Sequence, residues 1–466
     1  MPREALLEHL DALKSSDTDW KRGRNFAYVY FAGEEVHGLV QQAFLRFFAE
    51  NALNPTAFES LRRMEMEVVA MCADLFHGDA ETCGNLTGGG TESILMAVHT
   101  AREWFRRRGG RGRPQVVLPA SAHPAFHKAC HYFGLEARVV PLREDFRADT
   151  EAMIRALDEH TALVVLSAPS YPHGVVDPIP PVAAAARERG IPCHVDACIG
   201  GFLLPFLRGL GRPVPPFDFA VPGVTSLSAD LHKYGYAAKG ASLLLYRDPE
   251  MRKAQFYVYA DWPGGIYASP ALSGTRPGGA IAAAYAVLRF LGREGYTRLA
   301  ETIWHTTRRL QEGLQALPGL RVLSDPDMSL FALASEGFDI YRFGDELGLR
   351  GWLIDRQQLP PSLHFSVTPA HVAVVDAFLE DAAQAHAAVQ KTSLESLGTR
   401  AQVAAARALA RVLPRAWQPA FLRFAARHAP LGGKRSAALY GMMGELQPDG
   451  NLDALVREFL HRLLRP

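Results

Sequence analysis

Four short motifs hold residue types that could act together chemically. In the first, NLTGGGTES (85–93), Gly88, Gly89, Gly90 and Thr91 come just before a helical pattern. A helix N-terminus presents unpaired N–H groups and a positive dipole end, which suits a phosphate, and glycine lets the backbone approach it closely. The motif matches neither the Walker P-loop nor the GxGxxG pattern. On its own, such a turn is about as often an ordinary tight turn.

The other three motifs supply an aspartate, a lysine and a histidine. Asp196 ends the apolar run in HVDACIGGF, where an α/β protein places ligands, and could pair with a cationic ring nitrogen or cap a turn. Lys233, between His232 and Tyr234, could lose its proton in a desolvated site and form a Schiff base, although most lysines are solvated. His123 follows an apolar run and could stack on a flat cofactor or cap a helix.

The order of these motifs favours one cofactor. Pyridoxal 5′-phosphate (PLP) needs a phosphate anchor, a stacking platform, a partner for its pyridinium nitrogen and a lysine. The sequence therefore predicts a PLP-binding protein. We expect no metal site of the cysteine type, because the chain has 5 cysteines and no CxxC pair.

Apolar runs and helical segments alternate between about residues 85 and 250, which is typical of a mostly parallel sheet covered on both faces. We expect strands at 115–122, 137–142, 161–170, 192–198 and 242–248. We expect helices at 3–14, 38–50, 58–76, 91–108, 181–190, 279–294 and 296–317. Residues 261–279 are dense in Gly and Pro and predict an irregular loop.

These elements suggest an α/β protein in three parts. Residues 1–57 form an N-terminal helical arm, 58–317 a large PLP-binding domain, and 318–466 a smaller α+β domain. The basic segment 396–435 has no Asp or Glu and interleaves Arg and Lys with apolar residues. It is either a solvated helix packed on the small domain or a helix lying on an anionic membrane surface.

The overall charge excludes one class of partner. Lys and Arg number 50 and Asp and Glu 49, a net charge of +1, which argues against a dedicated nucleic-acid binder. The charged N-terminus has no apolar stretch typical of a secretory signal, and no run of about twenty apolar residues could span a bilayer. We expect a soluble, cytoplasmic protein, and the sequence does not address export into a host.

Beyond the motifs, the chain resembles the family of sphingosine-1-phosphate lyases, in the group II decarboxylase branch of fold-type I PLP enzymes. The strings TGGGTES, DLHKYGYAAKG and GGIYASPALSGTRPGG carry this resemblance. It runs from about residue 23 to 385 and resumes at 437–450. It implies a homodimer with shared active sites. The membrane-anchoring N-terminal segment of eukaryotic members is missing, which fits soluble bacterial members.

The resemblance also implies roles around the cofactor. Lys233 is the lysine that binds PLP covalently, Asp196 the partner of the ring nitrogen, and His123 the residue stacked on the ring. The residues implied to hold the cofactor phosphate are Gly89, Gly90, Thr91, His232 and, from the neighbouring subunit, Thr275, where the family usually has Ser.

On the substrate side, the resemblance implies a site lined by Tyr171, Lys239, Tyr30 and Tyr267. Lys239, Tyr30 and Asn54 are the residues implied near the substrate phosphate, and Arg276 is a further cation in a motif loop. The chain departs from the family at NALNPT (51–56), where the family commonly reads N-x-L-H-P-D. Asn54 thus replaces a histidine, and it can donate a hydrogen bond but carries no positive charge.

The implied reaction is the retro-aldol cleavage of a phosphorylated long-chain base to a fatty aldehyde and phosphoethanolamine. Tyr171 or Lys239 is expected near the proton transfers, but the base is unassigned, since a phenol and an ammonium both titrate at about 10. Two alternatives stay open. One is an amino-acid decarboxylase of the same branch, acting on glutamate or an aromatic amino acid. The other is a PLP-free, membrane-associated scaffold that uses the segment 396–435.

Overall fold

The apolar runs form a seven-stranded sheet in the order β1-β7-β6-β5-β4-β2-β3. The strands are β1 (Cys83–Thr87), β2 (Gln115–Pro119), β3 (Glu136–Val140), β4 (Thr161–Ser167), β5 (Cys193–Asp196), β6 (Ser226–Ala229) and β7 (Ser242–Tyr246). β7 alone runs in the direction opposite to that of the other six strands, so the sheet is mostly parallel, as expected. The sequence pattern does not indicate β1 and β6, because both are short and rich in small or polar residues.

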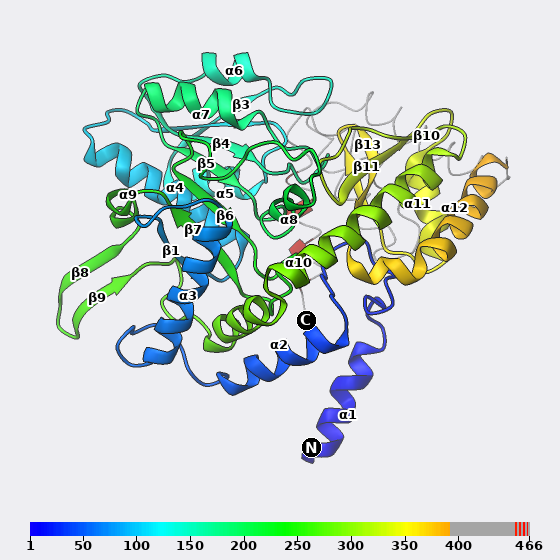
Figure 1. The fold of residues 1–466 in the computed structure, drawn as a ribbon, viewed down its shortest axis with the longest axis horizontal. Helices are drawn as coiled ribbons and strands as arrows, with labels where there is room; N and C mark the ends of the chain where they lie inside the picture. The colour runs from blue at the N-terminus through cyan, green and yellow to red at the C-terminus, as the bar shows by residue number, and fades with distance from the viewer. Residues whose placement is uncertain (392–452, 454–455, 458–459, 462–463, 465–466) are drawn as a thin grey trace.

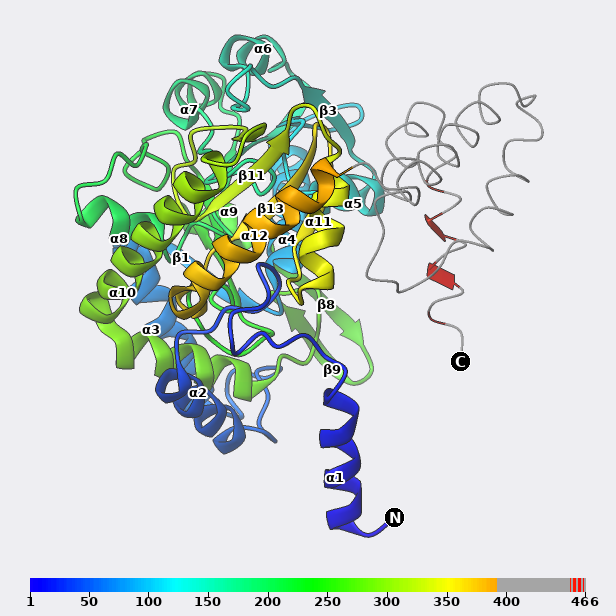
Figure 2. The same cartoon turned by 90° about the vertical axis from the view of Figure 1, so that its right-hand side faces the viewer.

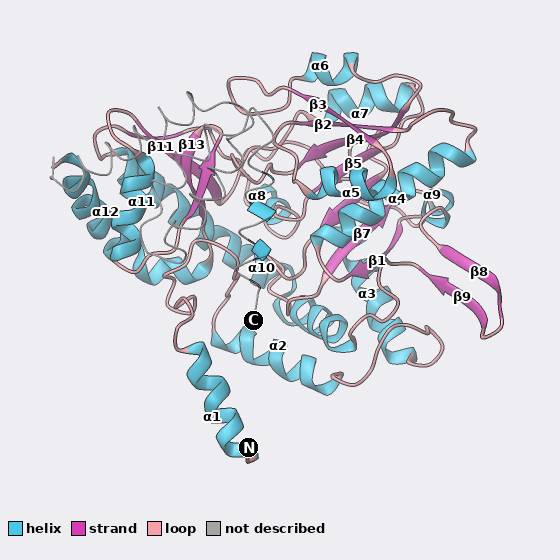
Figure 3. Ribbon diagram, turned by 180° about the vertical axis from the view of Figure 1, so that it is seen from behind, coloured by secondary structure: helices cyan, strands magenta, loops and turns pink. Residues whose placement is uncertain are grey.

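Helices cover both faces of this sheet in the computed structural model, which describes residues 1–391, 453, 456–457, 460–461 and 464 (Figure 3). One face carries α4 (Gly90–Arg107), α5 (Ala125–Phe133) and α9 (Pro249–Lys253). The other carries α3 (Glu59–Leu75), α6 (Thr150–Arg155), α7 (Ile179–Glu188) and α8 (Leu204–Gly209). In β4, Leu163 and Val165 pack toward α4 and α5, whereas Val164 and Leu166 pack into the opposite core. Burial on both faces explains the continuous apolar run of this strand.

A second unit lies beside the large sheet (Figure 1). Its antiparallel sheet has the order β10-β11-β13-β12. The elements are β10 (Leu320–Val322), β11 (Leu330–Ser335), α11 (Ile340–Leu349), β12 (Asp355–Gln358), β13 (Pro361–Ser366), the 3₁₀ helix η1 (Pro369–Val374) and α12 (Val375–Gln390). The core of this unit also contains Phe26 and Leu310, so it draws on residues before 318. The limits 1–57, 58–317 and 318–466 therefore stay a prediction.

The helices expected at 279–294 and 296–317 are both present, within α10 (Gly278–Gln315), and they meet at a kink at Gly292, where φ is 55°. One sequence expectation differs from the structure. Part of the expected loop at 261–279 is instead a hairpin of β8 (Tyr257–Trp262) and β9 (Gly265–Ser269), which projects from the body (Figure 1). Aromatic side chains favour strands, and glycine at the turn, with φ of 104° at Gly265, permits the reversal.

The N-terminal arm has a free and a packed part. Helix α1 (Arg3–Lys14) has no buried residue and projects away from the body, as Figure 2 shows. Helix α2 (Glu34–Arg46) packs on α10. Between them, the Phe26 N–H donates to the Leu353 carbonyl, and the Phe26 carbonyl accepts from the Ser366 N–H. The arm is thus built into the second unit.

Two expectations concern membranes. None of the helices in the described part of the chain is long and apolar enough to cross a bilayer. The basic segment 396–435 lies outside the described residues, so the structure does not bear on its contact with a membrane surface.

Candidate active site

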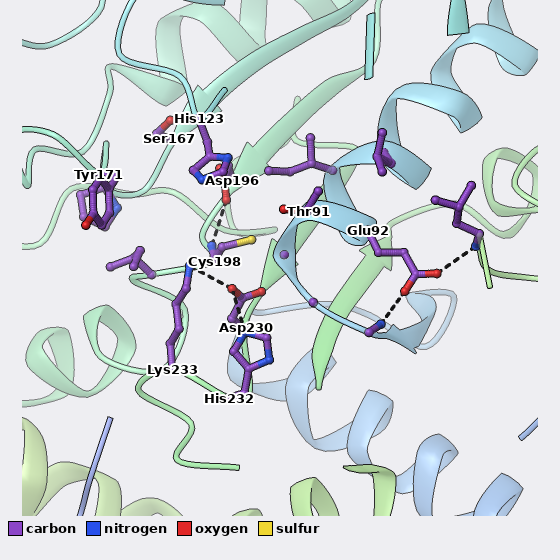
Figure 4. Close-up of a pocket in the computed structure, with 18 of the residues that line it drawn as sticks. Thr91, Glu92, His123, Ser167, Tyr171, Asp196, Cys198, Asp230, His232 and Lys233 are labelled. Atoms are coloured by element: carbon purple, nitrogen blue, oxygen red, sulfur yellow. Dashed lines mark hydrogen bonds and ion pairs between the residues drawn. The ribbon is translucent and has the colours of Figure 1, made fainter. Parts of the chain in front are cut away.

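Residues from all four motifs line one cavity of about 720 Å³. The strands β1, β2, β4, β5 and β6 all end at the same edge of the sheet, where parallel α/β sheets bind ligands. The segments that follow these strand ends supply the lining, which includes Gly89, Gly90, Thr91, His123, Ser167, Tyr171, Asp196, Cys198, His232 and Lys233 (Figure 4). The sequence motifs therefore do meet in space.

The glycine-rich loop is fixed by Glu92, the second residue after the last glycine. Its carboxylate accepts from the backbone N–H of Gly88 at 2.6 Å and from that of Leu272 at 2.9 Å. A Cβ added to Gly90 would lie 2.7 Å from Oδ2 of Asp230, so only glycine fits there. The first N–H groups of α4 have no intrahelical acceptor and lie at the cavity wall, which makes this loop a closely fitted cradle for an anion.

Asp196 ends β5 and is buried. Its Oδ1 accepts from the Cys198 N–H at 3.0 Å and from the Ser228 hydroxyl at 3.4 Å. The Ser228 oxygen also lies 3.2 Å from Nε2 of His194. Burial lowers the pKa of His194 to about 4, so this ring adds no positive charge beside Asp196 at neutral pH. The carboxylate is thus held in place by neutral groups that leave it able to pair with a cationic ring nitrogen.

Lys233 meets a carboxylate that the sequence analysis does not single out. Its Nζ lies 2.9 Å from Oδ2 of Asp230, whose side chain is 1% exposed (Figure 4). Burial by itself would lower the pKa of Lys233, but the negative charge of Asp230 outweighs it and the pKa is raised. The D-x-x-K spacing alone does not identify this pair, because the strand before it, β6, is short and rich in small or polar residues.

Both motif histidines are tied to protein groups. Nδ1 of His123 accepts the Ala125 N–H at 3.2 Å, so this ring caps α5 as well as lining the cavity. Nδ1 of His232 accepts the Ala241 N–H at 3.2 Å, and its Nε2 lies 3.6 Å from Asp230. A role for His232 at a cofactor phosphate stays a prediction.

Tyr171 lies on the cavity wall where the two units meet. Its hydroxyl donates to Oδ2 of Asp355 on β12 at 3.3 Å. Burial, and then the charge of Asp355, raise the pKa of Tyr171, so its phenol stays protonated at neutral pH.

Lys239 and Tyr30 lie on the other side of His232. They line a neighbouring cavity of about 630 Å³ that shares His232 with the first. Nζ of Lys239 donates to the Tyr28 carbonyl at 2.7 Å and lies 5.4 Å from the centre of the Tyr30 ring. Burial, and then the charge of Lys233, lower the pKa of Lys239. Of the two proton-transfer candidates, Lys239 thus has the environment that favours an unprotonated form.

Three further predicted site residues line neither of these two cavities. Tyr267 lies on the β8–β9 hairpin, and Thr275 is exposed in the loop after it. Asn54 is exposed, and its Oδ1 accepts from the Thr56 N–H at 2.9 Å and the Thr56 hydroxyl at 2.7 Å. Contributions of Tyr267 and Thr275 to a neighbouring subunit's site stay predictions.

Arg276, the further cation in a motif loop, is bonded to protein groups and does not line the main cavity. The side chain is buried, and its Nη2 donates to Oε2 of Glu65 at 3.0 Å. Nη1 donates to the Leu86 carbonyl at 3.1 Å. Arg276 therefore fixes α3 and the end of β1 beside the loop.

Comparisons with known proteins identify relatives of this chain. The pyridoxal-dependent decarboxylase conserved domain matches residues 5–334. Sphingosine-1-phosphate lyase 1 of Rattus norvegicus is 45% identical over 379 residues, which cover 81% of this chain and 66% of the rat protein. This chain thus spans just under two thirds of that relative. The Oryza sativa subsp. japonica sphingosine-1-phosphate lyase is 42% identical over 384 residues, covering 81% of this chain and 71% of the rice protein.

Solved structures agree with these relationships. A Burkholderia pseudomallei sphingosine-1-phosphate lyase is 40% identical, covers 89% of this chain and 96% of its own, and superimposes with a TM-score of 0.81. A glutamate decarboxylase from Lactobacillus brevis is 21% identical, covers 84% of this chain and 94% of its own, and has a TM-score of 0.74, which shows a shared fold. The predicted fold class, a fold-type I PLP enzyme, is confirmed.

Proposed function

This chain belongs to the sphingosine-1-phosphate lyase family of pyridoxal-dependent enzymes, and on that premise we propose that it cleaves a phosphorylated long-chain base by a retro-aldol reaction. The products are a fatty aldehyde and phosphoethanolamine. The observation that carries the proposal is the convergence of Lys233, Asp196 and the glycine cradle on one cavity.

The residues of this cavity fit PLP. The cradle at Gly89, Gly90 and Thr91 suits the phosphate, because its N–H groups lie at a helix N-terminus and a side chain at Gly90 would collide with Asp230. Asp196 supplies a carboxylate for the ring nitrogen, and His123 a flat ring beside it. Lys233 supplies the amine that binds the cofactor aldehyde.

Bound PLP supplies an electron sink that stabilises the negative charge left when the substrate C2–C3 bond breaks. The residues of this chain have the remaining tasks. Asp196 would stabilise a protonated, positively charged ring nitrogen, because a buried carboxylate without a cationic partner costs free energy. Lys233 would hold the cofactor covalently between turnovers, when its amine is unprotonated.

The surroundings of Lys239 and Tyr171 favour different roles for the two side chains, with Lys239 as the base and Tyr171 as a hydrogen-bond donor. A base must take the proton from the C3 hydroxyl, and the lowered pKa of Lys239 favours it for that step. Tyr171 keeps its proton and can donate a hydrogen bond to the substrate oxygen. When protonated, Lys239 also provides a point charge for the substrate phosphate, and Tyr30 packs beside it.

Product analysis tests this proposal. The purified chain is supplied with PLP and incubated with a phosphorylated sphingoid base, glutamate or tyrosine. We expect aldehyde and phosphoethanolamine from the first substrate and no CO₂ from the other two. Release of CO₂ without aldehyde would make the chain a decarboxylase. A colourless protein that binds anionic vesicles and converts none of these would favour the scaffold interpretation.

We further propose that two copies of the chain form a homodimer with shared active sites. In support, the hairpin that carries Tyr267 exposes apolar side chains: Tyr257, Val258, Tyr259, Trp262 and Ile266. Helix α1 exposes Leu6, Leu7, Leu10 and Leu13. Exposed apolar surface of this kind is common where a second copy packs. We also propose a cytoplasmic location and peripheral membrane contact through 396–435, on the basis of the sequence composition.

A further inference from the structure

We propose that Asp230 is a positioning residue that holds Lys233 as an ammonium and so sets the pH at which the chain takes up its cofactor. The inference rests on the proposed function in one respect, because it takes Lys233 as the lysine that binds PLP. It assigns a role to Asp230, the first residue of the DLHKYGYAAKG motif, to which neither the resemblance nor the relatives' names give a role.

The geometry places Asp230 where it can serve Lys233. Asp230 directly follows β6 and lies three residues before Lys233, and the Lys233 N–H donates to its carbonyl at 3.3 Å. This turn brings Nζ to 2.9 Å from Oδ2. On the other side, the start of α4 at Gly90 packs against the carboxylate so closely that a Cβ would lie 2.7 and 2.8 Å from its two oxygens. The carboxylate therefore has little room to turn away.

Besides Lys233, His232 and Ser242 interact with the Asp230 carboxylate. Its Oδ2 lies 3.6 Å from Nε2 of His232. Burial alone would raise the pKa of Asp230, but the charge of Lys233, and then hydrogen bonds from His232 and Ser242, lower it. A buried carboxylate costs free energy unless a charged partner offsets its desolvation. Lys233 is the cation in direct contact with it, so removal of the proton from Lys233 leaves Asp230 poorly compensated.

Several other ionisable groups face Lys233. Cys198 and Asp196 come from the end of β5, Tyr30 from the N-terminal arm, His123 from the start of α5, and His232, Tyr234 and Lys239 from its own loop. Burial raises the pKa of the Cys198 thiol and of the Tyr30 and Tyr234 phenols, so none of these is an anion at neutral pH. Asp196 is held by Cys198 and Ser228. Asp230 is therefore the carboxylate that contacts Lys233.

This contact has a chemical consequence. An ammonium has no lone pair, so Lys233 can attack the aldehyde of PLP only after it loses a proton. Transfer of that proton from Nζ to Oδ2 yields an amine and a neutral carboxylic acid, which conserves charge and needs no other reactant. As long as the Asp230 carboxylate stabilises the Lys233 ammonium, only a small fraction of Lys233 is the neutral amine that can react.

The test measures the reactivity of Lys233 in the full-length chain after PLP has been removed. Acetic anhydride labels amines but not ammonium groups, and peptide mapping by mass spectrometry follows Lys233 over a range of pH. In Asp230→Asn we expect the midpoint of labelling to fall by roughly 1–3 pH units, since an opposite charge in contact shifts a pKa by that much. At neutral pH, the absorbance of bound PLP should also develop roughly tenfold faster or more.

The matched control is Asp218→Asn, which removes another buried carboxylate, paired with Arg208 at 2.9 Å and outside the cavity lining. In Asp218→Asn, the pH midpoint for labelling of Lys233 should equal that of the unmodified chain. An unchanged midpoint in Asp230→Asn would overturn the inference. If Asp230→Asn does not fold, labelling of the unmodified chain tests the inference, with the exposed Lys128 as internal reference. Lys233 should be labelled only at higher pH than Lys128, and labelling at the same or lower pH would overturn the inference.

The same preparations separate this inference from the lyase proposal. A chain that releases aldehyde but shows no midpoint shift in Asp230→Asn retains the proposed function and loses this role. A chain that shows the shift but cleaves no phosphorylated base retains the role of Asp230 and loses the proposed substrate.

Discussion

The Tyr171 hydroxyl donates a hydrogen bond to Oδ2 of Asp355 at 3.3 Å, and this contact joins the large unit to the second unit at the cavity wall. The Tyr171 ring also lies 4.2 Å, between ring centres, from His364 of β13. The phenol is thus oriented from two strands of the second sheet. A residue so placed can keep its proton while it contacts a substrate oxygen.

Tyr171→Phe keeps the ring and removes this hydroxyl. We expect kcat for the phosphorylated sphingoid base to fall by roughly 10²-fold or more, as when a positioned proton donor is removed. Binding of PLP, followed by its absorbance, should be unchanged, because the hydroxyl is bonded to Asp355 and not to the residues proposed to hold the cofactor. Since the pKa of Tyr171 is raised, its loss should not remove an ionisation from the kcat profile between pH 6 and pH 9. A profile that loses its alkaline limb would contradict this role.

Lys239→Met removes the cation beside Tyr30 while keeping much of the side-chain volume. If Lys239 binds the substrate phosphate, KM should rise by roughly tenfold or more, since a charged hydrogen bond contributes about 1.5–3 kcal/mol. If Lys239 is also the base, kcat should fall, and the acidic limb of the profile of kcat against pH should move. Lys239→Arg is the matched variant: it should preserve KM better than kcat, because it keeps the charge but cannot deprotonate. Equal kinetics in all three proteins would exclude both roles.

The sequence predicts much of this site because its motifs directly follow strands, and parallel strands end at one edge of a sheet. The Asp230–Lys233 pair is missed because an isolated aspartate gives no signal until a structure shows what it contacts. Asp355 is missed for a different reason, since it reaches Tyr171 across 184 residues of chain. The hairpin at 257–269 is missed because Gly and Pro mark turns without showing whether strands flank them.

Buried histidines predict a loss of stability in acid. His371 is buried beneath the N-terminal arm, where its Nε2 lies 3.0 Å from the Asn25 carbonyl, and burial lowers its pKa to about 4. An unfolded chain, with a histidine pKa of about 6.5, binds this proton more readily than the folded one. The stabilisation is therefore complete above about pH 6.5 and is lost as the pH falls toward 4.

Urea unfolding between pH 4 and pH 7.5 measures this effect. The single histidine contributes at most roughly 3 kcal/mol to the change in the free energy of unfolding. His371→Gln should be less stable than the unmodified chain at pH 7.5, but its stability should change less between pH 7 and pH 4. His9, an exposed residue of α1, offers the control, because His9→Gln should leave the pH dependence unchanged. Equal slopes for His371→Gln and the unmodified chain would contradict the assignment.

Deletion of residues 396–435 tests the basic segment. If this segment helps extract an amphiphilic substrate from a surface, the deletion should reduce activity on substrate in anionic vesicles by roughly tenfold or more, because each basic side chain near such a surface contributes about 1 kcal/mol. Activity on a soluble short-chain substrate should change little. The two assays, run on the same preparation, provide the comparison, and equal losses in both would show that the segment has no specific role at the membrane.

Two inactive variants can test whether active sites are shared. Lys233→Ala should bind no PLP covalently and have no turnover, because Lys233 is the one lysine that lines the main cavity among the described residues. The double variant Thr275→Ala with Tyr267→Phe should also be impaired, but through side chains that do not line the cavity of their own chain. If these two residues complete the neighbouring site, a mixed dimer contains one site with an intact lysine and an intact partner contribution. Refolding the two variants together should then restore part of the activity, whereas each refolded alone should remain inactive. Undiminished turnover of Lys233→Ala would refute its assignment, and a mixture no more active than its components would refute the shared site.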